Sequence, residues 1–414
     1  NLVYVGKGLF NPGGGAEFAA SKLLSLITDP SIRITVLTDK NSLKEGNKRK
    51  SKKNRKILYH NKNIEKIIAV PLIKIKIPLI TDIFNGIRFR KVIRQLKNEM
   101  KIDLIHIHGF NTFYVFFNSV NHKKEKKIGL TYIYTIHDFP EKWCWTPENF
   151  FPFNIIESIW KWLVKSLWRK LLNASKSTES PRIVFHALSS EIKEFLINFG
   201  IHSKNVFFLP NGRDDSYENL IAKGTGNKLP PGKREKFIVL CVGEINNRKN
   251  QSLLFRAMEL NQAKNIKVIL LGAPTPIVGR FYFMKIWSQL NPNIKGKIIW
   301  LGKITEQKKL VEVFNNSNLL VIPSFSEASP LVSFEAIQME MPIISTATGS
   351  LIDTFPPQNR ILKPNDPQLL GQTLDFFSEN REKLKDYIIS KKPVKTWIEI
   401  GNELTNHYFE FSNY

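Results

Sequence analysis

The chain has 414 residues, 61 Lys and Arg against 36 Asp and Glu, and a formal net charge of +25. At roughly 150 residues per domain, this length predicts two or three domains. A hydrophobic content of 42% is that of a folded protein and excludes a wholly disordered one. Cys144 and Cys241 belong to no CxxC or Cys/His cluster, which argues against a structural zinc site and a disulfide framework. A reducing cytoplasm is the expected compartment.

The positive charge is concentrated in the first half of the chain. Residues 1–220 contain 36 basic and 19 acidic residues, whereas residues 221–414 contain 25 and 17. Two basic runs, 44–56 and 123–127, lie between turn-forming residues. Such runs fit solvated loops, an anionic membrane surface or a nucleic-acid contact, and no aromatic and basic RNA signature supports the last of these.

Neither a membrane span nor a cleaved leader is expected. Charges interrupt every apolar stretch well before the ~20 residues that a transmembrane helix needs. The chain begins at Asn1 and runs directly into the strand-like LVYVG, without a basic and then apolar leader. The missing Met leaves open a trimmed N-terminus.

Short β-branched runs alternate with helical patterns along most of the chain, which predicts two series of βα units. In the first series we expect strands at 2–5, 32–37, 104–108, 132–136 and 183–188, and helices at 16–27, 87–100 and 191–199. A Gly-, Pro- and Lys-containing stretch, 211–236, then interrupts the alternation. In the second series we expect strands at 237–242, 266–271, 297–301, 319–322 and 342–345, and helices at 250–260, 306–316, 329–341 and 367–378.

Nearly continuous apolar strands predict parallel sheets covered on both faces. We therefore expect an α/β protein with two Rossmann-like domains, 1–212 and 237–393, joined by a linker at 213–236. Open parallel sheets bind ligands beyond the carboxyl ends of their strands, and tandem domains place the ligand in the cleft between them. The loops that follow strands are thus the candidate sites.

The first such loop ends in three glycines, Gly13, Gly14 and Gly15, directly before a helix. Glycines here allow phosphates or a sugar to approach the backbone, and the amides of a first helical turn favour an anion. The spacing fits neither GxGxxG nor a P-loop, so an NAD site is disfavoured. A flexible turn without a ligand is the alternative.

Histidines follow two other strands of the first domain. His137 and Asp138 follow the strand expected at 132–136, where an imidazole could donate to a sugar hydroxyl or a phosphate oxygen. His106 and His108 alternate on another strand, and we expect His108 near the ligand and His106 in the core. A purely structural role is the alternative for each.

In the second domain, Arg248 and Lys249 are expected at the start of the helix that follows the first strand. Two cations there oppose the helix macrodipole, and an anionic ligand would remove the conflict. A planar guanidinium and a point charge together suit a diphosphate.

The segment 323–340, PSFSEASPLVSFEAIQME, predicts a second anion-binding helix end. Ser329 is expected to cap a helix that has Pro330 in its first position, which leaves the amides of Leu331 and Val332 without intrahelical acceptors.

Two carboxylates, Glu327 and Glu335, flank this helix end. Carboxylates accept hydrogen bonds from pairs of hydroxyls, which suits the diols of a sugar and a ribose. A pair of solvated surface glutamates is the alternative.

The Glu-x7-Glu of Glu327 and Glu335, followed by PIISTATGS, resembles the signature of retaining GT-B glycosyltransferases of family GT4. The GGGAE loop, the TIHD and VGEINNRKN strand ends and the FLPNG before the linker are similar to further landmarks of that family, in the same order. The resemblance spans nearly the whole chain and implies a GT-B fold, with parallel sheets facing across a cleft. It also implies that the final helix, within 394–414, crosses back onto the first domain.

Carried over residue by residue, the resemblance implies donor contacts from Glu335 to the ribose and from Glu327 to the sugar hydroxyls. Arg248 and Lys249 would hold the diphosphate, and His137 would reach the transferring sugar. The glycine loop would face the donor phosphate and the acceptor. Ser329, Leu331 and Val332 complete the expected donor site; Gly13, His108 and Asp138 complete the acceptor side.

The resemblance implies a hexosyltransferase that needs no metal and no cofactor besides its nucleotide-sugar co-substrate. The expected acceptor is a glycan or a lipid-linked precursor in the synthesis of a surface polysaccharide or lipopolysaccharide, and no nucleic-acid partner is expected.

Two departures leave an alternative open. Glu244 stands where many members have arginine, and Ala328 stands where glycine is typical. Either Arg248 replaces the missing cation, or the protein is a silent GT-B-like scaffold that binds a nucleotide sugar or a membrane.

Five of the eight tryptophans lie between 143 and 168, with basic residues interleaved. They are Trp143, Trp145, Trp160, Trp162 and Trp168. Ile159, Leu163, Leu167 and Leu171 form an apolar stripe at helical spacing, which is typical of a helix in a membrane interface. A helix packed on its own domain is the alternative. The favoured interpretation is an anionic membrane surface on the cytoplasmic side.

Overall fold

The computed structural model divides the chain into two compact units. The first comprises Asn1–Pro140, Trp162–Gly212 and Trp397–Tyr414, and the second includes Arg213–Thr396. The structure describes residues 1–10, 12–46, 61–72, 78–109, 130–137, 162, 165–166, 168–173, 175–176, 182–215, 217, 236–260, 265–275, 278–389 and 394–412. Asp138, the basic runs beyond residue 46, and Trp143, Trp145 and Trp160 lie outside these ranges.

The first unit is built on a parallel seven-stranded sheet with the order β3-β2-β1-β4-β5-β6-β7. Its strands are β1 (Leu2–Gly6), β2 (Ile34–Asp39), β3 (Ile64–Val70), β4 (Leu104–His108), β5 (Thr131–Ile136), β6 (Arg182–Ala187) and β7 (Val206–Phe208). The helices named below are α1 (Gly15–Leu26), α2 (Lys40–Gly46), α4 (Pro78–Glu99), α8 (Ser190–Asn198) and α17 (Trp397–Ser412). All residues of β1, β2, β4, β5 and β6 are buried, as expected for a sheet covered on both faces.

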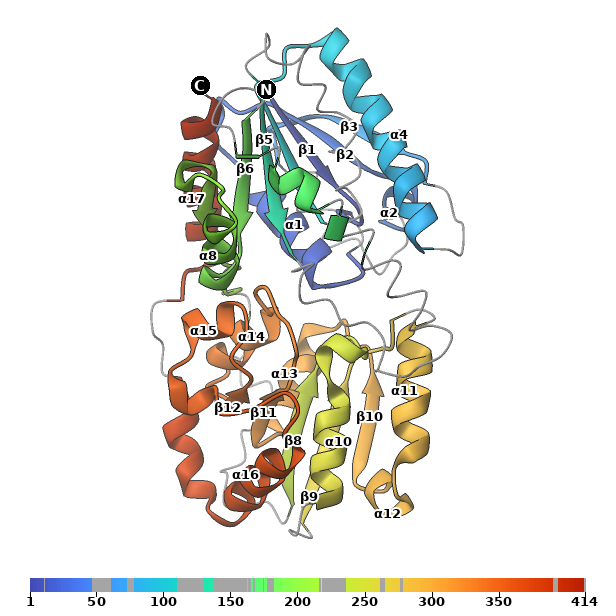
Figure 1. The fold of residues 1–414 in the computed structure, drawn as a ribbon, viewed down its shortest axis with the longest axis vertical. Coiled ribbons are helices and arrows are strands. Elements are labelled where there is room, and N and C mark those ends of the chain that lie inside the picture. Colours follow the sequence, from blue (N-terminus) through green and yellow to red (C-terminus); the bar gives the residue numbers. More distant parts are fainter. Residues whose placement is uncertain are drawn as a thin grey trace. The chain divides into compact units, whose positions relative to one another are not determined.

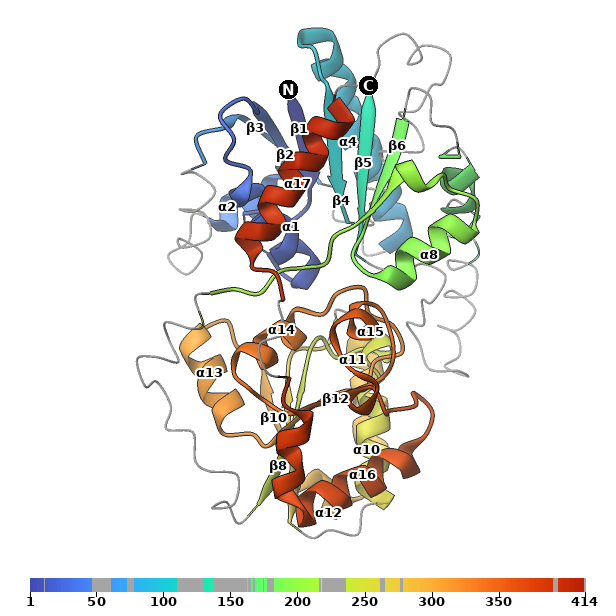
Figure 2. The ribbon, with the colours of Figure 1, turned by 90° about the vertical axis from the view of Figure 1, so that its left-hand side faces the viewer.

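The last helix, α17, belongs to the first unit and lies beside α1 (Figure 2). Gly401 permits this close approach, because a Cβ at that position would lie 2.7 Å from the Cβ of Leu26. Ile400, Leu404, Tyr408 and Phe411 recur at helical spacing and are buried. One apolar face therefore holds α17 on the unit.

The second unit is a parallel five-stranded sheet with the order β10-β9-β8-β11-β12 (Figure 1). Its strands are β8 (Phe237–Val242), β9 (Ile266–Leu271), β10 (Ile298–Gly302), β11 (Leu319–Ile322) and β12 (Ile343–Ser345). Its helices are α10 (Gln251–Leu260), α11 (Val278–Gln289), α12 (Pro292–Lys295), α13 (Gln307–Asn315), α14 (Leu331–Gln338), α15 (Ser350–Thr354) and α16 (Pro367–Glu379). Two apolar clusters, each including strand residues of this sheet, form its core.

The sequence pattern did not predict several elements of the structure, among them β3, β7 and α11. The strand β3 is only partly buried and β7 is three residues long, so neither carries a continuous apolar run. The helix α11, VGRFYFMKIWSQ, is rich in glycine, aromatic and β-branched residues, which are weak helix formers.

The membrane-interface interpretation is wrong for two residues of the Trp-rich segment. Trp168 and Leu171 are buried, and the Trp168 ring packs against Tyr134 and Phe185 in the first unit. Trp162 is 68% exposed. The remaining stripe residues, Ile159, Leu163 and Leu167, lie outside the described residues. Among the helices that the structure describes, none is both long and apolar enough to cross a bilayer.

Candidate functional site

The glycine loop of the first unit is held by acidic side chains. Gly14 precedes α1 as its N-cap, and the amide of Gly13 donates to the carboxylate of Glu17 in the first helical turn. Burial raises the pKa of Glu17, although its hydrogen bond from Gly13 and the charge of Lys7 oppose this rise. The Glu17 carboxylate thus accepts the hydrogen bond of the Gly13 amide, in the loop where the sequence predicted that amides would bind an anionic ligand.

Asp39, the last residue of β2, and Ser42 in α2 fix the other end of this loop. Asp39 accepts from the amide of Gly8 at 2.8 Å and from that of Ser42 at 2.7 Å, and the Ser42 hydroxyl accepts from Phe10. Gly8 has a φ of +71°, and a Cβ there would meet the Glu17 carboxylate. These supports were not found in the sequence, because Asp39 and Ser42 lie some thirty residues beyond the loop.

His108 and His137 come together at the carboxyl ends of the adjacent strands β4 and β5. His108 Nδ1 lies 3.1 Å from His137 Nε2. The His108 ring also stacks on Tyr4, with 4.6 Å between centroids. Burial lowers the pKa of His137 to about 4, and it lowers that of His108 well below the ordinary value. Both rings are therefore neutral at pH 7, and one of them donates to the other.

His106 lies in the core, as expected, and belongs to a chain of buried hydrogen bonds. His186 Nε2 lies 2.7 Å from the carbonyl oxygen of Leu209, which can only accept, so this nitrogen carries the proton. Burial lowers the pKa of His186 to about 3, so the ring is neutral and its Nδ1 accepts from the Thr135 hydroxyl. Thr135 then accepts from His106 Nε2 at 2.7 Å, and His106 Nδ1 accepts from the hydroxyl of Tyr408. These hydrogen bonds all donate in the same direction, from Tyr408 towards Leu209, and they join α17 to the strands β4, β5 and β6.

In the second unit, Arg248 and Lys249 do not lie in the first turn of a long helix, so that prediction was wrong. They form a short 3₁₀ turn, Asn247–Lys249, and α10 begins only at Gln251. Asn250 separates the two with a φ of +53°, and its side-chain amide donates to the carbonyls of Pro323 and Pro364. The two cations therefore do not lie within the first turn of α10, where the sequence predicted that they would oppose its macrodipole.

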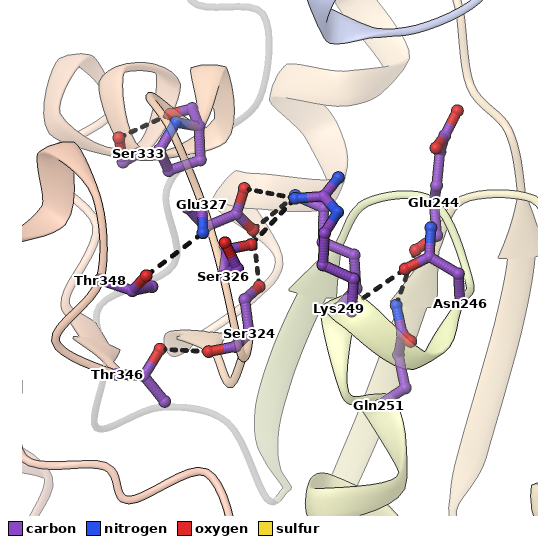
Figure 3. A network of polar contacts seen from close by, with 12 residues as sticks. Glu244, Asn246, Lys249, Gln251, Ser324, Ser326, Glu327, Ser333, Thr346 and Thr348 are labelled. Atoms are coloured by element: carbon purple, nitrogen blue, oxygen red, sulfur yellow. Dashed lines mark hydrogen bonds and ion pairs between the residues drawn. The ribbon is translucent and has the colours of Figure 1, made fainter. Parts of the chain in front are cut away.

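Both cations bind the buried carboxylate of Glu327, which follows β11 (Figure 3). Lys249 Nζ lies 2.6 Å from Oε1 and Arg248 Nη1 lies 3.4 Å from Oε2. The Ser324 hydroxyl donates to Oε1 at 2.6 Å, and Arg248 also donates to the carbonyl of Ser326. Burial alone would raise the pKa of Glu327, but Lys249 and then Arg248 outweigh it and hold this pKa below its ordinary value.

The loop that carries Glu327 is fixed on its other side by the chain after β12. The amide of Glu327 donates to Thr348, and the carbonyl of Ala328 accepts from the amide of Ser350. Gly349 has a φ of +55°, and a Cβ there would lie 2.0 Å from the carbonyl oxygen of Glu327. Only glycine therefore fits at position 349 with this loop in place.

The helix α14 begins at Leu331, with Pro330 in the N-cap position, so the prediction that Ser329 caps it was wrong. Pro330 has an extended backbone and Ser329 is buried beside it. The first-turn amides, those of Leu331 and Val332 included, have no acceptors within the helix itself.

Glu335 lies on α14, eight residues after Glu327, and accepts from the hydroxyl of Tyr217 at 3.0 Å. Burial raises the pKa of Glu335 to about 7, and the Asp214 carboxylate adds to this rise, although the Tyr217 hydrogen bond opposes it. Tyr217 stands in the stretch assigned to the linker, where no pattern marked it.

Glu244, the acidic residue at the end of β8, does not join the Glu327 cluster. Its backbone carbonyl accepts from Gln251 at 2.9 Å, and Figure 3 shows its carboxylate pointing away from Glu327. Arg248 and Lys249 are the cations that the structure places against Glu327.

Comparisons with known proteins agree with this architecture. The family model for glycosyl transferases group 1 matches residues 228–392, and that for glycosyltransferase family 4 matches residues 13–217. An uncharacterized glycosyltransferase of Methanocaldococcus jannaschii is 25% identical over 179 residues, which are 41% of this chain and 44% of that protein. The match therefore spans less than half the length of that relative.

Several solved structures share the fold over nearly their whole length. Sucrose-phosphate synthase from Thermosynechococcus elongatus has a TM-score of 0.68 at 15% identity and covers 99% of this chain and 98% of its own. Anabaena HepE in complex with UDP and glucose has a TM-score of 0.64 at 14% identity, with 98% of each chain covered. The lipopolysaccharide outer core galactosyltransferase WaaB has a TM-score of 0.61 at 15% identity, with 99% of each chain covered. The fold is thus that of the GT-B glycosyltransferases, and the chain belongs to the group 1 and family 4 glycosyltransferases.

Proposed function

We propose that this protein is a retaining, metal-independent glycosyltransferase that moves a hexose from a nucleoside-diphosphate sugar to a glycan or lipid-linked acceptor. The observation that carries this proposal is the buried carboxylate of Glu327, which forms ion pairs with Arg248 and Lys249 and lies eight residues before Glu335. Two similar structures were solved with UDP or UDP-glucose, which makes UDP the first nucleotide to test.

In the proposed reaction, the bond between the anomeric carbon and the diphosphate oxygen breaks, and a bond to an acceptor hydroxyl forms on the same face of the sugar. The acceptor's proton leaves with the diphosphate. Arg248 and Lys249 stabilise the negative charge that develops on the leaving group, which is electrostatic catalysis by preorganised charges. Glu327 accepts from sugar hydroxyls, and the neutral His137 hydrogen-bonds the transferring sugar.

Glu335 provides a further test through its proton. At pH 7 the carboxyl is only about half ionised, because its pKa is about 7. Two ribose hydroxyls that donate to it would favour the ionised form and lower this pKa. Binding of UDP should therefore release a fraction of a proton at pH 7. Calorimetry in two buffers of different ionisation enthalpy measures this release.

Activity is tested by transfer or hydrolysis of a panel of UDP- and GDP-hexoses, with wild type and Glu335→Ala compared. The proposal expects turnover by wild type and a large loss in the variant. Equal turnover in both would overturn the assignment. A wild type that binds UDP without turnover would favour the alternative, a silent scaffold in which Glu244 and Ala328 mark a decayed site.

The setting proposed for this reaction is the synthesis of a surface polysaccharide or lipopolysaccharide at the cytoplasmic face of a membrane. One of the similar structures, WaaB, is named as a lipopolysaccharide outer core galactosyltransferase. The net charge of +25 supports an anionic surface as partner, because positive charge near an anionic bilayer favours binding.

A further inference from the structure

Tyr217 is a buried tyrosine whose hydroxyl lies between two polar side chains of the second unit. Tyr217 is 6% exposed and belongs to the same apolar cluster as Val332 and Ala336 of α14. Its hydroxyl donates to Glu335 Oε1 at 3.0 Å. The oxygen of this hydroxyl accepts from the side chain of Gln307, at the start of α13. Packing therefore fixes the ring, and a donor and an acceptor fix the direction of the hydroxyl.

The backbone that carries Tyr217 is attached to α14 as well. The Gln338 side chain donates to the carbonyl oxygen of Asp214 at 2.8 Å, and this oxygen also accepts from the Tyr217 amide at 3.2 Å. Gln338 and Glu335 are three residues apart, so they lie on one face of α14. One turn of chain, 214–217, is therefore hydrogen-bonded to that face at both of its ends.

These contacts leave the two oxygens of Glu335 in different situations. Oε1 accepts from Tyr217, whereas none of the residues that the structure describes is hydrogen-bonded to Oε2. An ionised carboxylate can accept at both oxygens, and a protonated one has lost part of this capacity. Oε2 is therefore the oxygen that a ligand hydroxyl can use without displacing Tyr217.

The turn 214–217 also acts on the charge of Glu335. Burial raises the pKa of Glu335 to about 7, the Tyr217 hydrogen bond opposes this rise, and the Asp214 carboxylate adds to it. In the described part of the chain, these two residues are the titratable groups that act on Glu335. A hydroxyl that donates to a carboxylate favours its ionised form. Tyr217 therefore keeps a larger fraction of Glu335 ionised near pH 7 than burial and Asp214 would leave.

We propose that Tyr217 is a positioning residue of the ribose site, whose hydroxyl holds Oε1 of Glu335 and leaves Oε2 for a ribose hydroxyl. Gln307 orients the Tyr217 hydroxyl, and Gln338 holds the turn that carries it. The carboxylate is then preorganised before the ligand arrives, which lowers the entropy cost of binding. This role rests on the proposed function, because ribose is the ligand proposed for Glu335, and it adds the residues that prepare this carboxylate.

The test is calorimetric titration of the full chain with uridine and with 2′,3′-dideoxyuridine, at pH values from about 6 to about 8.5. Neither nucleoside carries a phosphate, so the pair isolates the ribose hydroxyls. For wild type we expect uridine to bind more tightly as the pH rises through about 7, because the ionised carboxylate accepts from the ribose. Dideoxyuridine should show no such dependence. Guanosine and its dideoxy analogue form a second pair of probes.

Tyr217→Phe keeps the ring and removes the hydroxyl. A hydrogen bond to an ionised group changes its ionisation equilibrium about tenfold, so the pKa of Glu335 should rise in the variant. We expect the variant to bind uridine roughly fivefold more weakly than wild type at pH 7, and less than about twofold more weakly at pH 8.5, where both proteins have Glu335 mostly ionised. The affinity for dideoxyuridine should equal that of wild type at both pH values.

Two further variants separate this role from an effect on folding. Gln307→Leu leaves Tyr217 in place, removes the donor to its hydroxyl, and should shift the pH profile in the same direction by less. Tyr282→Phe is the matched control, because Tyr282 is buried in the same unit and its hydroxyl accepts from the amide of Ser252 at 3.0 Å. It should leave the pH profile for uridine unchanged. Unfolding midpoints show whether each variant folds.

Two results would overturn the role of Tyr217. One is the same pH profile for uridine in wild type, Tyr217→Phe and Gln307→Leu. The other is an equal loss of affinity for uridine and dideoxyuridine in Tyr217→Phe, which would reduce the hydroxyl to a part of the packing. A wild type that binds neither uridine nor guanosine would contradict the proposed function as well. Failure of the role of Tyr217 alone therefore leaves nucleoside binding intact.

Discussion

The two units treat buried ionisable groups in opposite ways at the carboxyl ends of their strands. The first unit buries His106, His108 and His186, all with lowered pKa values. Hydrogen bonds among neutral partners join His106 to His186 through Thr135, and His108 to His137. The second unit keeps a buried carboxylate, Glu327, ionised between two cations. Burial dominates in the first case, whereas nearby opposite charge dominates in the second.

This contrast bears directly on ligand chemistry. Neutral imidazoles suit hydroxyl groups, whereas a cation pair suits a diphosphate. Glu327 serves as the counterion that holds Arg248 and Lys249 in place. An incoming diphosphate would share these cations with it.

The largest expected effect comes from removing one cation of the second unit. Lys249→Ala leaves the buried Glu327 with the longer contact to Arg248 as its remaining ion pair, and breaking a buried ion pair in this way should cost about 3 kcal/mol of unfolding free energy. Chemical denaturation measures this cost. The double variant Lys249→Met, Glu327→Gln removes both charges and should regain most of the stability. A single variant as stable as wild type would show that the pair is not buried as described.

A smaller effect is expected in the pH dependence of stability, because Glu335 in the second unit and His186 in the first unit act in opposite directions. Glu335 has a folded pKa of about 7 against an ordinary 4.5, so the folded state binds the proton more tightly. Its contribution to stability is therefore greatest at low pH and is lost as pH rises from about 4.5 to 7. His186, with a folded pKa of about 3 against 6.5, acts in the opposite sense, and its contribution is lost as pH falls below 6.5.

Glu335→Gln should stabilise the protein at pH 8 by about 2 kcal/mol, and it should make little difference at pH 4.5. Gln keeps an oxygen that can accept from Tyr217, so the hydrogen bond is preserved. Unfolding midpoints from pH 4.5 to 8 measure the difference. A stability gain that does not depend on pH would contradict a raised pKa for Glu335.

The smallest effect tests the neutral chain of the first unit. Tyr408→Phe removes the donor to His106 Nδ1 and should cost about 1 kcal/mol, since a buried acceptor is left without its partner. The conservative variant leaves the apolar packing of α17 in place. An unfolding midpoint equal to that of wild type would contradict a stabilising hydrogen bond between Tyr408 and His106.

Local sequence patterns predicted the fold better than the site. The bounds of β8, β9 and β11 agree with the expected ranges, because each is a short and largely apolar run. The sequence pattern did not predict the helix α11, because many of its residues favour strands and tertiary packing overrides this preference.

Sequence patterns marked the candidate site residues, but they did not mark the partners of these residues. Lys249 and Glu327 are 78 residues apart, and nothing in either segment marks the other as its ion-pair partner. The same holds for Glu335 and Tyr217, which are 118 residues apart. Capping rules placed the start of α14 one residue early, because bonds from the loop to Thr348 and Ser350 keep the chain extended as far as Pro330.

The role proposed for Arg248 and Lys249 is to hold the diphosphate of the nucleotide. Calorimetric titration of wild type and Arg248→Ala with UDP, and with uridine as the uncharged reference, tests it most directly. We expect the variant to bind UDP at least tenfold more weakly, because charge-assisted bonds to phosphate are lost, and to bind uridine as wild type does. Equal affinity of both proteins for UDP would contradict the account.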